Sequence, residues 1–403
     1  MTKTGKTVVG IAVGLLISSV VLSTAGLRAV AQGQPVLRIG VNGVMSGPAA
    51  SWGLVNKYSA ETTAAMINAK GGWQIGDRKY RIEIVSLDDR NDPKVSVTNV
   101  ERLASMGIKY IIGPNVDTTA GAIVPVLERA GIINIPYAFN KDLYSPPRSN
   151  SILGMIASYQ AGPVIYKYLM EKKGVRTLAF LARNEADPLN QRDEGVAAAK
   201  RLGLSVLSSE NTYEPGTTNF SQVLSRILPQ RPDLLVLSGV APSDAPLIIK
   251  AARELGYRGL ISTETAQDAK ILQEVAGGTA NGFISVGGAS TPEIQSKYME
   301  DFVSEYIKRV GEWNDEAGTK VYALEMILRT LALAGPKAIN DVEEFKKAIS
   351  RFNIPNPFLK EAKPLKYVGT AYFKQPRQIG VPMVVNEFRD GKFVTLFVGS
   401  VDE

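Results

Sequence analysis

Short apolar runs alternate with amphipathic segments along the chain from Leu37 onward. The strands expected in this first part are Leu37–Val44, Arg81–Leu87, Ile108–Ile112 and Ile132–Ile135, and the helices expected between them are Asn56–Ala69, Pro93–Ser105 and Thr118–Ala130. Alternation of β and α patterns at this spacing is typical of a parallel sheet with helices on both faces.

The same rhythm restarts after a break near residues 151–158. Its expected strands are Thr177–Leu181, Leu204–Leu207, Leu234–Leu237 and Leu260–Ser262, and its expected helices are Gln160–Lys172, Leu189–Leu202, Phe220–Leu228 and Ala245–Leu255. Two successive series predict an α/β protein with two doubly wound lobes.

The order of elements changes near Val286. The helices Pro292–Arg309, Asp315–Ala334 and Asp341–Phe352 are expected in succession, and the strands Val381–Phe388 and Lys392–Val398 end the pattern. If the helices pack on the first sheet and the last strands join the second, the chain crosses between lobes three times. Three adjacent crossings form a hinge with a ligand cleft beside it. We therefore expect residues 35–155 plus 287–368 to form lobe 1, and residues 156–286 plus 369–403 to form lobe 2.

Residues 1–31 have the pattern of a secretory signal peptide. Lys3 and Lys6 precede an apolar stretch, and Ala29-Val30-Ala31 predicts cleavage after Ala31. The alternative is a retained membrane anchor. No later segment approaches the roughly 18 apolar residues that a spanning helix needs, so we expect a soluble, periplasmic mature protein.

Composition removes several classes of function. The 403 residues contain neither cysteine nor histidine, so the usual general base and a thiolate nucleophile are missing, and we expect no enzyme and no cofactor. Acids are interspersed with the basic residues that give the net charge of +7, which does not favour nucleic acid. The acids Asp88, Asp89 and Asp92 match no calcium loop, and we expect no metal site.

Four segments, in order, resemble one known family. They are MSGPAASWG with AMINAKGG (45–72), LDDRNDPKVSV (87–97), IIGPNVDTTAGAIVPVLERAGIINIPYA (111–138) and DFVSEYIKRVGEWNDEAGTKVYALEMI (301–327). Together they resemble the leucine/isoleucine/valine-binding family of ABC-importer receptors. The resemblance implies a type I periplasmic-binding fold, closure on a small-molecule ligand, and delivery to the membrane permease subunits of an ABC importer. We expect the protein to be a monomer.

The resemblance also implies ligand-binding positions in the first lobe. Trp52 matches an aromatic residue that covers the ligand in the family, although it could instead pack on its own lobe. Backbone N–H groups near Asp117, Thr118 and Thr119 suit a carboxylate, but these residues are also good helix N-caps. The family usually has serine or threonine at the position of Asp117. A carboxylate there would repel a ligand carboxylate or satisfy the helix itself.

The remaining expected contacts come from residues 136–139 and from the second lobe. At Tyr137-Ala138-Phe139, amino-acid binders of the family have a small and then a hydroxyl-bearing contact residue; the two rings here could stack on a flat ligand or fill the core. Glu264 aligns with the acid that pairs with the ligand ammonium, or is satisfied within its loop. Further contacts are expected at strand ends from Tyr159, Asn190 and Val240.

These features predict a solute-binding protein for an amino acid or a related small organic carboxylate. An aromatic acid or an amide is an alternative ligand. Two alternative functions are a secreted hydrolase that pairs Asp117 with Glu264, and an extracellular sensor of the same fold.

Overall fold

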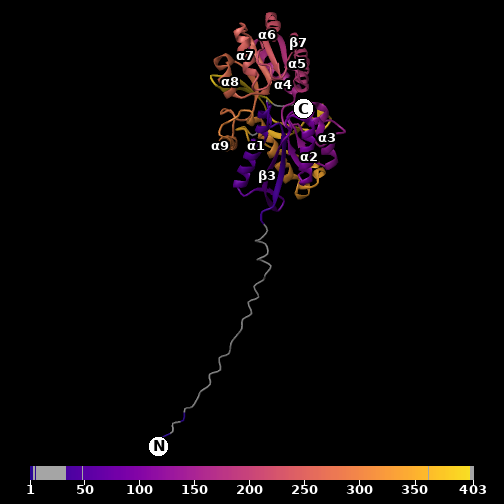
Figure 1. The fold of residues 1–403 in the computed structure, drawn as a ribbon, viewed down its shortest axis with the longest axis vertical. Coiled ribbons are helices and arrows are strands. Elements are labelled where there is room, and N and C mark those ends of the chain that lie inside the picture. Colours follow the sequence, from indigo (N-terminus) through magenta and orange to yellow (C-terminus); the bar gives the residue numbers. More distant parts are fainter. Residues whose placement is uncertain (3–4, 6–32, 48, 362, 400–403) are drawn as a thin grey trace. The chain divides into compact units, whose positions relative to one another are not determined.

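The computed structural model describes residues 1–2, 5, 33–47, 49–361 and 363–399. Most of the predicted signal peptide, including its cleavage site, lies outside the described residues. The chain from Val36 onward forms one compact unit (Figure 1). Among the described residues, no helix combines the length and the apolar character needed to cross a membrane.

The first series folds into a five-stranded sheet with the order β2-β3-β1-β4-β5. Its elements are β1 (Val36–Gly43), α1 (Ala50–Ala69), β2 (Trp73–Ile75), β3 (Arg78–Asp88), α2 (Pro93–Ser105), β4 (Tyr110–Ile112), α3 (Asp117–Ala130) and β5 (Ile133–Ile135). All neighbours pair in parallel except β2, which forms an antiparallel hairpin with β3. Apolar residues of β1, β4 and β5 are buried, as expected for a sheet covered on both faces.

The second series folds into a seven-stranded sheet with the order β15-β14-β10-β9-β8-β6-β7. Its elements are α4 (Ser158–Lys173), β6 (Thr177–Arg183), α5 (Ala186–Arg201), β7 (Ser205–Tyr213), α6 (Ser221–Ile227), β8 (Leu234–Ser238), α7 (Ala245–Glu254), β9 (Leu260–Ala266), α8 (Ala269–Val275), β10 (Ile284–Gly287), β14 (Met383–Arg389) and β15 (Lys392–Gly399). Strands β6 to β10 run parallel, and the terminal hairpin adds antiparallel to β10.

The helical run between the two visits to the second sheet packs on the first sheet. It contains α9 (Lys297–Val310), α10 (Ala317–Lys320), α11 (Tyr322–Ala334) and α12 (Val342–Ile349), followed by β11 (Asn353–Pro355), β12 (Pro364–Val368), α13 (Thr370–Phe373) and β13 (Gln378–Ile379). The Trp73 Nε1–H donates to the Leu328 carbonyl at 2.9 Å, which joins β2 to α11. The Tyr110 hydroxyl donates to the Ala338 carbonyl.

Several expected helix boundaries are wrong. Helix α1 begins at Ala50 and not at Asn56, so Trp52 lies in its first turn. Helix α5 begins at Ala186 and not at Leu189. Helix α9 begins at Lys297, because the Ser296 hydroxyl caps it by accepting the Met299 N–H at 3.1 Å. The helix expected over 315–334 is divided at Val321 into α10 and α11.

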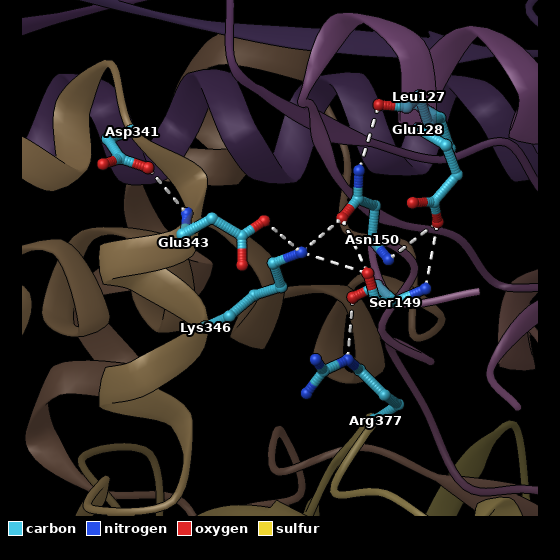
Figure 2. A network of polar contacts seen from close by, with 8 residues as sticks. All are labelled: Leu127, Glu128, Ser149, Asn150, Asp341, Glu343, Lys346 and Arg377. Carbon is cyan, nitrogen blue, oxygen red and sulfur yellow. Dashed lines mark hydrogen bonds and ion pairs between the residues drawn. The ribbon is translucent and has the colours of Figure 1, made fainter. Parts of the chain in front are cut away.

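The described chain passes between the two large sheets after β5, after β10 and after β13, which is the connectivity expected of the fold. The exact lobe boundaries stay a prediction. Figure 2 shows polar contacts between the first passage and the residue just before β13: the Arg377 guanidinium donates to the Ser149 carbonyl at 2.9 Å. The Lys346 ammonium donates to Ser149 Oγ and Asn150 Oδ1, both at 3.0 Å, and Glu128 accepts both backbone N–H groups of that pair. This network anchors the start of the first passage to α3 and α12.

Candidate ligand-binding site

A cavity of about 330 Å³ lies where strands of both large sheets end. Its lining residues follow the carboxyl ends of β1, β4 and β5 in the first sheet, and of β6, β8, β9 and β10 in the second. The remaining walls come from α10 and from the segment that leads into β14. This is the place where ligands bind in open α/β sheets.

One wall of the cavity is aromatic. It includes Trp52 from α1 and Tyr137 and Phe139 from the segment after β5. A cation lies over two of these rings: the Arg183 guanidinium carbon is 5.0 Å from the centre of the Trp52 ring, and the Lys320 ammonium is 4.0 Å from that of Tyr137. Such cation–π contacts help to orient the rings, and each covers one face of its ring.

The cavity brings together five of the residues expected to bind ligand. These are Trp52, Thr118, Tyr137, Phe139 and Glu264. They come from both sheets, so the expected convergence of the two lobes on one space is present in their geometry. That they bind a ligand stays a prediction.

Asp117 does not line the cavity, and its carboxylate accepts hydrogen bonds from backbone N–H groups. Its Oδ1 accepts the N–H groups of Phe139 at 2.7 Å and Asn140 at 2.9 Å. Its own N–H donates to the carboxylate of Asp187, at 3.1 Å to Oδ1 and 3.4 Å to Oδ2. The first turn of α3 therefore already faces a carboxylate of the protein.

The other expected residues also lie off the cavity wall. The Thr119 hydroxyl donates to the Val116 carbonyl at 3.0 Å, and Ala138 and Val240 are buried in apolar clusters. The Tyr159 ring stacks on Tyr372 with centroids 3.7 Å apart. The Asn190 amide reaches the Phe139 carbonyl at 3.4 Å, which is a contact between α5 and the first series.

Sequence reasoning missed several charged and polar residues of the cavity. They are Arg183, Glu185, Asp187, Gln191, Glu316 and Lys320. The position of Arg183 at the end of a predicted strand could have indicated it. Glu316 and Lys320 fall inside a predicted helix, where charged residues are ordinarily solvated, and nothing in the pattern distinguishes them.

Several buried polar atoms of the cavity lining have no hydrogen-bond partner within the described part of the chain. These atoms are Tyr137 Oη, Arg183 Nε, Gln191 Oε1, Glu264 Oε2 and Glu316 Oε2. Buried polar groups in native proteins are nearly always hydrogen-bonded. These atoms are able to form hydrogen bonds with a molecule that enters the cavity.

Burial changes the protonation of the acids in the cavity. Burial raises the pKa of Glu264 to about 7, and the hydroxyl of Tyr166, which donates to Glu264 Oε1, offsets part of this rise. Loss of hydration raises the pKa of Asp187 well above its usual range, and the nearby Asp117 adds to the effect. A cationic group placed against either acid would favour its ionised form.

The acids of the site do not gather into a metal centre. Among the described residues, no group of three or more potential metal-ligating acids is found, and the chain has no histidine or cysteine to extend one.

Comparisons with known proteins support this view of the fold. A family model described as periplasmic binding protein matches residues 36–389. The Leu/Ile/Val-binding protein of Escherichia coli strain K12 is 27% identical over 253 residues, which span 62% of this chain and 66% of that relative, just under two thirds of its length.

Solved structures show the same fold at lower identity. A leucine binding protein from Thermotoga maritima MSB8 has a TM-score of 0.75 at 18% identity, covering 91% of this chain and 99% of that one. A solute binding protein from R. palustris in complex with 4-hydroxybenzoate has a TM-score of 0.73 at 17% identity, covering 91% and 97%. The type I periplasmic-binding fold, with two α/β lobes, is thus confirmed. These relatives are described as binding proteins, which agrees with the expectation that the chain is not an enzyme. With a family match over most of its length, the chain belongs to the periplasmic binding protein family, as its resemblance to leucine/isoleucine/valine-binding receptors predicted.

Proposed function

We propose that this protein is the extracytoplasmic solute-binding protein of an ABC importer and captures an amino acid or a related small organic carboxylate. The observation that carries the proposal is the cavity between the two sheets, with its aromatic wall and its unpartnered buried polar atoms. The family and the E. coli relative support a role in solute binding.

Binding would act through closure of the two lobes. Contacts already join the two series of elements, because the Asp117 N–H donates to Asp187 and the Arg183 guanidinium lies over the Trp52 ring. A ligand that touches both Trp52 and Glu264 adds contacts that exist only in the closed state. It therefore shifts the open–closed equilibrium toward closure, and a membrane permease can recognise the closed form.

The lining favours a ligand with a flat or apolar body and a hydrogen-bond donor. Glu264 Oε2 is buried and has no hydrogen-bond partner among the described residues, so it suits an ammonium or amide N–H of the ligand. The aromatic wall suits an aliphatic or an aromatic body equally. We therefore keep an aromatic acid as the second candidate, in line with the neighbour that binds 4-hydroxybenzoate.

The paired-carboxylate hydrolase is not favoured. Such an enzyme needs two acids that face the same substrate, but the Asp117 carboxylate is directed to the backbone of Phe139 and Asn140 and does not line the cavity.

We further propose that the protein is exported to the periplasm by the signal peptide over residues 1–31 and works there as a monomer.

Thermal unfolding of the mature protein, from Gln32, against leucine, isoleucine, valine, 4-hydroxybenzoate and acetamide tests the proposal. A ligand at one hundred times its dissociation constant should add about 2.7 kcal/mol to the free energy of unfolding. The variant Glu171→Gln, changed at an exposed position on α4, should keep the shift in the midpoint. The absence of any shift across the panel would refute this choice of ligands.

Uptake of the labelled ligand by a strain that lacks the gene separates the importer receptor from the sensor of the same fold. Loss of uptake is expected for the receptor. Retained uptake with altered signalling would favour the sensor.

A further inference from the structure

A buried charged pair, formed by Glu316 just before α10 and Lys320 at the end of α10, lines the cavity and has no role in the binding scheme above. The side chains of Glu316 and Lys320 are 8% and 6% exposed, and Lys320 Nζ is 3.7 Å from Glu316 Oε1. The Lys320 ammonium also lies 4.0 Å from the centre of the Tyr137 ring. Both residues line the same wall of the cavity.

The Lys320 ammonium has N–H donors that its pairing with Glu316 does not use. A separation of 3.7 Å is too long for a hydrogen bond, and an ammonium carries three N–H donors. Burial lowers the pKa of Lys320, and Glu316 offsets part of this effect. A buried ion pair is often no more stabilising than apolar side chains of similar volume, so stability alone does not account for a lysine at this place.

The start of α3 would also suit an anion, but a carboxylate of the protein already occupies it. The first N–H of α3, at Asp117, donates to the Asp187 carboxylate at 3.1 Å, and the Asp117 carboxylate lies beside it. A ligand carboxylate brought to the start of α3 would meet these two acids. The Asp117 N–H is already bound by Asp187, and the Asp117 carboxylate would repel a second anion, so the start of α3 is a poor site for an anionic ligand in this protein.

Two cations line the described part of the cavity, and they differ in what they already bind. The Arg183 guanidinium pairs with Glu185 through Nη2 and lies over the Trp52 ring, although its Nε has no partner. The Lys320 ammonium has one distant carboxylate and the face of a ring. A carboxylate placed at Lys320 gains full charge-assisted hydrogen bonds, whereas one placed at Arg183 has to share the guanidinium with Glu185.

We propose that Lys320 receives the carboxylate of the ligand, so that the anionic end of the ligand lies at α10 and not at the start of α3. Glu264, on the side of the second sheet, then binds the donor end, and the rings of Trp52 and Tyr137 lie along the body. This inference rests on the proposed function and specifies its ligand as a carboxylate whose orientation is set by Lys320.

The test compares carboxylates with their amides by titration calorimetry. L-leucine is paired with L-leucinamide, and 4-hydroxybenzoate with 4-hydroxybenzamide. The variants are Lys320→Met and the double variant Lys320→Met/Glu316→Gln, which avoids leaving a buried carboxylate without its cation. A third variant, Lys320→Arg, keeps the charge.

In the wild-type protein, we expect at least one carboxylate to bind more tightly than its amide. Both Met-containing variants should weaken that carboxylate about 10- to 100-fold, the usual effect of removing one charged hydrogen bond. They should weaken the amide less than about 3-fold, and Lys320→Arg should restore part of the preference.

Equal losses for carboxylate and amide, or no loss for either, would overturn the role of Lys320 while leaving the binding function intact. A carboxylate-selective loss in Arg183→Gln, with none in the Lys320 variants, would move the site to Arg183 and also overturn it. If the wild-type protein binds neither pair, the proposed ligand class itself fails, and the inference fails with it.

Discussion

The variant Glu264→Gln tests whether this buried acid controls the pH dependence of stability. Glu264 is 7% exposed, and burial raises its pKa from 4.5 to about 7 in the folded protein. The folded state therefore binds the proton more tightly than the unfolded state. The resulting stabilisation is fully present below about pH 4.5 and is lost as the pH rises through about 7.

The magnitude follows from the rise of the Glu264 pKa from 4.5 to about 7, because a change of one in pKa corresponds to about 1.36 kcal/mol. Between pH 4.5 and pH 8 the wild-type protein should lose about 3 kcal/mol of folding free energy at this residue. Glutamine keeps the shape, and its carbonyl can still accept the Tyr166 hydroxyl, but it does not ionise. The variant should therefore gain about 3 kcal/mol relative to the wild type over this range, a rise of roughly 4 °C in the relative midpoint.

Scanning calorimetry of both proteins without ligand, at half-unit steps from pH 4.5 to 8, measures this difference. The exposed Glu171→Gln serves as the matched control and should differ from the wild type by the same amount at every pH. A difference between Glu264→Gln and the wild type that stays constant with pH would refute the reasoning. An amine-bearing ligand should reduce the effect, because a cation beside Glu264 favours its ionised form.

Three further variants probe the cavity. Trp52→Ala removes the ring that lies under Arg183. Because a large apolar side chain contributes about 1.5–3 kcal/mol when buried, the variant should weaken ligand binding about 10- to 100-fold in calorimetry. Unchanged affinity would exclude Trp52 from the site. Tyr137→Phe removes a buried hydroxyl that has no partner among the described residues and should raise the unfolding free energy of the ligand-free protein by about 1 kcal/mol, as denaturant titration can measure. Asp187→Asn removes an acid whose pKa is raised well above its usual range by burial and by the nearby Asp117. Relative to the wild type, the variant should gain stability as the pH rises above the ordinary aspartate range, because the ionised form is disfavoured in the folded protein. Denaturant titration at several pH values measures this, and a loss of relative stability over the same rise would contradict the contact with Asp117.

Local pattern predicted most of the secondary structure because it depends on near neighbours. Strands β1, β6 and β8 are buried on both faces, and their continuous apolar runs are easily recognised in a sequence. The strands β2, β10, β11, β12 and β13 and the short helices α8 and α13 were not predicted. Strand β10 is short, and it is stabilised as a strand because β9 and β14 pair with it.

Some residues of the candidate site could also be predicted from local pattern, whereas the partners of others could not. Trp52, Tyr137, Phe139 and Glu264 could be selected because each stands near the end of a predicted strand or in a segment that resembles a known family, and all four line the cavity. The sequence showed that Asp117 is unusual for that family, but it did not show which residues form hydrogen bonds with Asp117. Those partners, Phe139, Asn140 and Asp187, come from other segments of the chain.

The sequence by itself determined the α/β rhythm, the two series of elements, the family and several members of the cavity wall. Only the tertiary structure decided that Lys320 and Glu316 face the cavity, and that a carboxylate of the second series occupies the start of α3. The physical reason is that helix and strand patterns arise from interactions between residues close in the chain. The burial, charge and partners of a side chain depend instead on which distant segments pack around it.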